Sequence, residues 1–147
     1  MEKARKDLKV YSIVILALAA IVLIGNIVSV CVKGLPPITE IPEGLTKEAV
    51  EIIKIISFAL TFVVLIPQIF VGIKGIKVAK NPDARGKAHM VWAIILAVLS
   101  AVAVISGTID LVKKFDVDLL LGVINNVLDV CIFIGYYLCA RKIANAK

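Results

Sequence analysis

The sequence predicts an all-α integral membrane protein, built as an antiparallel bundle of four transmembrane helices. Of the 147 residues, 61% are hydrophobic, whereas a soluble domain has roughly 45–50%. The 19% that are charged lie almost entirely between long apolar runs. Four of these runs are long enough to cross a bilayer, which takes ~20 residues as a helix. We therefore expect a single membrane domain over 1–147, with no soluble domain.

The segments of this domain are bounded by residues typical of helix ends. Thr46 is a suitable N-cap for the second helix. Asn81-Pro82 ends that helix, because proline lacks the amide hydrogen and restricts the residue before it. The predicted segments are a first helix at 10–32, an outer loop at 33–46, a second helix at 47–80 with its lipid-spanning part at 55–73, a cytoplasmic loop at 81–88, a third helix at 89–112 and a fourth helix at 117–141.

Lysine and arginine are distributed unequally between the two sides of this bundle. Twelve of the 17 fall in the N-terminal head, the second connection and the tail, which share one side. The cytoplasmic flanks of membrane proteins carry such an excess, so both termini are predicted to be cytoplasmic (N-in/C-in). The short loops favour a plasma membrane or prokaryotic inner membrane. Basic flanks meet lipid headgroups, so we expect no nucleic-acid partner.

A basic stripe follows the lipid-spanning part of the second helix. Lys74, Lys77 and Lys80 recur every three residues at the predicted headgroup level. Their expected partners are the bilayer and its anionic lipid headgroups at the cytoplasmic face. Simple anchoring and a specific site for one anionic lipid are the two alternatives.

Short similarities between the halves suggest two tandem helical hairpins as a further possibility. The run starting at Val10-Tyr11 is similar to the one starting at Val91-Trp92, and 69–72 is similar to 132–135. Both hairpins would enter from the cytoplasm, so the repeat would be parallel. Chance similarity between apolar segments is the alternative.

Asp129 is the main candidate for a functional residue. It stands at the midpoint of the fourth apolar run, where a charged carboxylate costs ~2.5–3.5 kcal/mol on insertion scales. Asn126 and Tyr136 share its helical stripe, and Asn125 lies one turn before it. No Lys, Arg or His lies at that depth in any span. Asp129 is therefore either a cation or proton site or a neutral acid that hydrogen-bonds neighbouring helices.

Other polar residues within the spans complete the set of candidates. Gln68 and Thr61 share a stripe of the second helix with small residues, and Asn26 is predicted to face the bundle from the first helix. Pro67 removes a backbone hydrogen bond and is a candidate hinge. The candidate ion or substrate path therefore comprises Asp129, Asn125, Asn126, Gln68, Asn26 and Thr61, although close helix packing would explain the stripe of the second helix equally.

Enzymatic activity, cofactors and a metal site are not expected. His89 is the single histidine, and its place at the start of the third helix predicts a structural or solvated role. No motif of a P-loop, a zinc protease or a serine hydrolase is present.

Tyr136, like Trp92, is expected at the cytoplasmic interface, where amphipathic rings concentrate.

Pro67-Gln68, followed by Lys74, resembles the Pro-Gln motif of PQ-loop and SWEET-type transporters. The resemblance implies that the Pro-Gln pair helps the bundle flex and that Asn125 or Asn126 lines a substrate site. It covers two short motifs in about 80 residues. The serine before the pair and the aromatic-Gly motif of the middle helix are missing, and an extra helix precedes the repeat, so the family is not assigned.

Two functions remain compatible with these residues. The first is a homo-oligomeric channel or transporter with a polar intramembrane site around Asp129, since four helices alone make thin walls for a pore. The second is a non-conducting membrane scaffold or accessory subunit, in which the polar stripes join helices.

Overall fold

A computed structural model describes residues 2–35, 46–81 and 87–146 of the chain. These residues form four α-helices, and the described part contains no strand. The prediction of an all-α chain with four helices long and apolar enough to span a membrane is confirmed. The helices are α1 (Glu2–Lys33), α2 (Lys47–Lys80), α3 (Ala88–Lys113) and α4 (Val117–Ala144).

Local hydrogen bonds explain two helix starts and one helix end. The hydroxyl of Thr46 accepts a bond of 3.3 Å from the amide of Ala49, which caps α2 as the sequence predicts. The carboxylate of Asp116 accepts a bond of 2.8 Å from the amide of Asp118 and caps α4. At its other end α2 stops at Asn81, whose amide donates to the carbonyl of Lys77.

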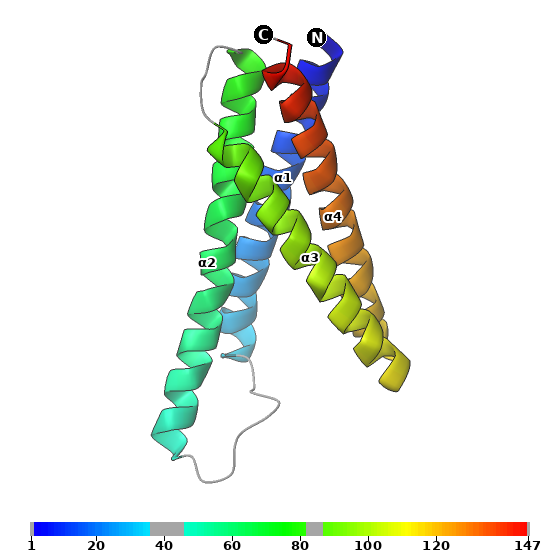
Figure 1. The fold of residues 1–147 in the computed structure, drawn as a ribbon. Coiled ribbons are helices and arrows are strands. Elements are labelled where there is room, and N and C mark those ends of the chain that lie inside the picture. Colours follow the sequence, from blue (N-terminus) through cyan, green and yellow to red (C-terminus); the bar gives the residue numbers. More distant parts are fainter. Residues whose placement is uncertain (1, 36–45, 82–86, 147) are drawn as a thin grey trace.

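The helices form two hairpins, α1–α2 and α3–α4, that meet at one end and diverge at the other (Figure 1). Both chain termini lie at the end where the hairpins meet. There α1 packs on α2 and α4, and α3 packs on α4 and α2. We call the end near the termini the closed end and the other the open end.

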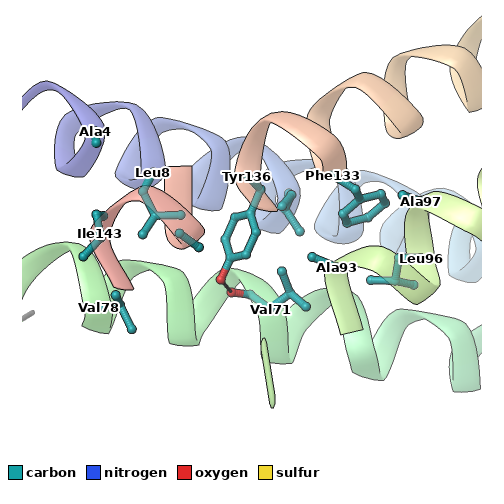
Figure 2. Close-up of a cluster of buried hydrophobic side chains, with 12 residues drawn as sticks. Ala4, Leu8, Val71, Val78, Ala93, Leu96, Ala97, Phe133, Tyr136 and Ile143 are labelled. Carbon is teal, nitrogen blue, oxygen red and sulfur yellow. Dashed lines mark hydrogen bonds between the residues drawn. The ribbon is translucent and has the colours of Figure 1, made fainter. Parts of the chain in front are cut away.

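Buried residues are confined to the closed end. They lie within 4–19 of α1, 65–78 of α2, 89–97 of α3 and 133–143 of α4. Leu8, Val71 and Tyr136 are 0% exposed at the centre of this core (Figure 2). Further along each helix, none of the side chains that the structure describes is buried. The closed end therefore holds the bundle together.

The basic head of the chain is itself helical. α1 begins at Glu2, eight residues before the first apolar run, and its first turns bury Ala4 and Leu8. These two residues stand one turn apart, on the same face as Ser12 and Ile15. The first two turns of α1 thus belong to the core, while Lys3, Lys6 and Lys9 remain exposed.

Candidate functional site

A buried hydrogen-bonded group lies at the centre of the closed end. The hydroxyl of Tyr136, on α4, lies 3.0 Å from the carbonyl oxygen of Val71 on α2. It also lies 2.8 Å from Nδ1 of His89 at the start of α3. Tyr136 is 0% and His89 is 4% exposed, and their rings meet edge to face with centroids 5.9 Å apart. Figure 2 shows the tyrosine ring reaching across the core from α4 to the backbone of α2.

The number of available protons restricts how these bonds form. A phenol has one hydrogen to donate and can also accept. Both bonds are made together when Nδ1 of His89 carries a proton and donates to Tyr136, while Tyr136 donates to Val71. When Nδ1 is bare, Tyr136 donates to His89 instead and the Val71 carbonyl loses that donor. Nδ1 with its proton and Nδ1 without it therefore give two hydrogen-bond arrangements of the same pair, with and without the bond to Val71.

The first helix contributes a second hydroxyl to this group. Ser12 is 0% exposed and donates to the carbonyl of Leu8 over 2.7 Å. A Cβ on Gly75 of α2 would overlap the Ser12 hydroxyl and come within 2.8 Å of the Tyr136 hydroxyl. Ser12 and Tyr136 therefore meet at the bare backbone of Gly75. We call Ser12, His89, Tyr136 and the Val71 carbonyl the buried polar cluster, to which each of the four helices contributes one member.

Glycines allow the helices to approach this closely. A Cβ on Gly72 would lie 2.5 Å from Cγ of Leu16, and one on Gly135 would lie 2.6 Å from the ring of Tyr11. Both contacts join α1 to another helix at the level of the core. Close backbone approach at small residues is typical of helix association within membranes.

Asp129 lies on the same face of α4 as Tyr136, towards the open end. The two residues are seven positions apart, which is close to two turns, or about 10 Å along the axis. Asp129 is half-buried. It lies one turn closer to the open end than Phe133, the buried residue of α4 nearest that end. Among the described residues, no side chain forms a hydrogen bond or ion pair with it. A carboxylate without a protein partner in this position needs water, a proton or a cation.

Gln68 and Asn26 continue the faces of α2 and α1 in the same way. Gln68 lies seven residues before Gly75, as Asp129 does before Tyr136, so both lie about two turns beyond the contact between α2 and α4. Asn26 lies seven residues beyond the buried Ala19. Both side chains are half-buried.

The remaining candidate residues are placed less uniformly. Asn126 is half-buried and Asn125 is exposed. The side chain of Thr61 lies outside the described residues. Pro67 is half-buried in a groove with Phe70 and Trp92, and α2 continues as a helix through it.

The three lysines of the basic stripe are exposed on α2 near the closed end. Nζ of Lys74 lies 6.0 Å from the centre of the Phe70 ring, at the limit of a cation–π contact. Lys74 is also within electrostatic range of His89. None of these lysines contributes to the buried core.

The buried polar cluster was not predicted from the sequence. The sequence predicted only that Tyr136 lies near the cytoplasmic interface, and the structure adds that its ring and hydroxyl lie inside the core. The sequence feature that could have indicated the burial of Tyr136 was its spacing from Asp129, which puts both residues on one stripe of the helix. His89 is buried rather than solvated, which favours the structural alternative. Its pairing with Tyr136 spans 47 positions, so no local pattern could indicate it.

Comparisons with known proteins do not add to this geometry. No family model matches the chain, and neither the curated proteins nor the solved structures contain a match. No group of three or more metal-ligating side chains occurs in the part of the chain that the structure describes.

Proposed function

We propose that the chain spans a plasma or prokaryotic inner membrane four times, with both termini in the cytoplasm. The excess of lysine and arginine around the termini and the second connection supports this orientation. Large apolar side chains such as Ile24, Ile66 and Val112 are exposed on the described helices, and lipid would cover them. In this orientation the closed end faces the cytoplasm and the open end faces the outside.

We propose further that the protein is a small channel or transporter with its polar site at Asp129. The observation that carries this is the position of Asp129, half-buried and without a partner among the side chains that the structure describes, on the face that leads into the closed end. Water entering between the diverging hairpins would reach it from the open end. Gln68, Asn126 and Asn26 would supply uncharged donors and acceptors nearby.

A homo-oligomer is the form we propose for transport. Four diverging helices do not enclose a path at the open end (Figure 1). A second copy packed against the splayed hairpins would supply the missing wall.

The anionic headgroups of the cytoplasmic leaflet are the proposed partners of Lys74, Lys77 and Lys80. Each lysine would contribute about 1 kcal/mol of binding free energy near a charged surface.

Replacement of Asp129 tests the transport function. In proteoliposomes, we expect the wild type to carry protons or monovalent cations and Asp129→Asn to reduce the flux to that of empty vesicles. Asparagine keeps the shape but can neither hold a proton nor balance a cation. Asp118→Asn is the matched control, because Asp118 is an exposed acid on the same helix.

Three outcomes separate the two functions. Flux lost in Asp129→Asn and kept in Asp118→Asn supports a transport site. Equal flux in all three proteins would show that Asp129 is not the site. No flux from folded wild-type protein would favour the scaffold, in which the uncovered inner faces of the hairpins bind another membrane protein.

The proposed orientation predicts the reactivity of Cys31. This exposed cysteine lies near the open end of α1. In a variant with Cys131→Ser and Cys139→Ser, we expect a membrane-impermeant maleimide to label Cys31 on intact cells. A cysteine placed by Ala146→Cys in a chain without the native cysteines should react only after permeabilisation. The reverse pattern would contradict the N-in/C-in orientation.

A further inference from the structure

The core at the closed end leaves no path for a hydrated ion. Leu8, Val71 and Tyr136 are 0% exposed, and Phe133 and Ile143 are nearly so. A metal cation needs several oxygen ligands at each point of its path, whereas the buried cluster offers two hydroxyls, one imidazole and one carbonyl. A proton needs only a continuous series of groups that both accept and donate. Tyr136 and His89 are such groups.

We infer, resting on the proposed transport function, that the species carried past the core is the proton, and that Tyr136 and His89 relay it between the Asp129 side and the cytoplasmic side. The supporting geometry is the 2.8 Å contact between the phenol oxygen and Nδ1, together with the shared helix face of Tyr136 and Asp129. About 10 Å of helix separates these last two residues, and the relay requires water molecules to bridge this gap.

The transfer conserves protons at every step. A hydronium on the Asp129 side gives a proton to the oxygen of Tyr136, and the O–H bond that faces His89 breaks as an N–H bond forms at Nδ1. The imidazolium then loses the proton on Nε2 to water on the cytoplasmic side. Tyr136 is a neutral phenol before and after. Nε2 is then the bare nitrogen, so His89 must change its side-chain rotamer to bring Nε2 to the phenol before the next proton is carried.

Two neighbours of the pair fit this sequence. After transfer, Nδ1 carries the proton and donates to Tyr136, and the Val71 carbonyl accepts the new phenol proton at 3.0 Å. Burial of the ring and the positive charge of Lys74 both oppose a charge on the imidazole, so both favour release of the proton. Ser12 already donates to the Leu8 carbonyl and takes no part in the transfer.

Proteoliposome flux of the full-length protein tests the relay, with a potassium diffusion potential as the driving force and an internal pH dye as the readout. Tyr136→Phe keeps the ring in the core and removes the hydroxyl, and His89→Gln keeps a polar group that cannot pass a proton on. We expect each to lower proton flux by about 10²-fold, the usual contribution of a positioned proton-transfer group. Tyr137→Phe, the half-buried neighbour, should leave the flux unchanged.

Each other result overturns the relay in a distinguishable way. Unchanged or increased proton flux in Tyr136→Phe and His89→Gln would mean that their hydrogen bond only holds the closed end together. Potassium or sodium flux through the wild type, measured without a proton gradient, would show that a hydrated cation passes. Either result is compatible with a transport function of Asp129. Absence of any flux in folded wild-type protein would overturn both.

Discussion

We expect Gly75→Ala to destabilise the bundle by about 1–3 kcal/mol, the usual cost of overpacking a core. The added Cβ would overlap the Ser12 hydroxyl and lie 2.5 Å from Cε2 of Tyr136. Neither neighbour moves freely, because Ser12 is bound to the Leu8 carbonyl and Tyr136 is bound to Val71 and His89. Reversible unfolding of the purified protein in mixed detergent micelles would measure the loss.

Gly25→Ala is the matched control for this substitution. Gly25 lies inside α1 near the open end, and nothing lies within 4 Å of the position of its Cβ. Alanine favours a helix over glycine by up to ~1 kcal/mol, so this variant should be as stable as the wild type or more so. Equal destabilisation by both substitutions would contradict the close contact at Gly75.

Leu8→Ala should cost about 2–5 kcal/mol, as for other buried leucines. Leu8 is 0% exposed and packs in the core, although it precedes the predicted first span. Alanine would leave a cavity beneath α1, which neighbouring helices can fill only in part. The same unfolding measurement would detect this as a lower midpoint.

Val10→Ala provides the comparison for Leu8. Val10 is two residues further along α1 and is 59% exposed. Its truncation removes no buried contact and should change the stability by less than about 0.5 kcal/mol. If Leu8→Ala had as little effect, the first two turns of α1 would not belong to the stable core.

The predictions for Gly75 and Leu8 depend on contacts between helices that the sequence did not indicate. Ser12, Gly75 and Tyr136 each lie on a stripe visible in the sequence, but their mutual contact depends on how α1, α2 and α4 pack. Tyr136 shows the limit most clearly. An aromatic ring near a membrane interface is most often exposed there, and only the approach of α2 and α3 supplies the partners that let its hydroxyl be buried.

The candidate site shows the same division. Asp129 could be singled out because an acid at the middle of an apolar run is costly wherever the helix lies. Its relation to Tyr136 follows from helical periodicity. The cost of a buried acid and helical periodicity do not predict that both residues face a bundle that is closed at one end. The uneven packing of the two hairpins decides this feature (Figure 1).

The sequence by itself determined the number of helices, the ends of α2 and the apolar character of all four segments. These depend on local properties: the length of apolar runs, the Thr46 cap and the Asn81-Pro82 stop. Only the tertiary structure decided that the first turns of α1 join the core, that the hairpins diverge and that His89 pairs with Tyr136. These features depend on contacts between helices far apart in the chain, and in an almost uniformly apolar sequence many faces are equally suited to such contacts.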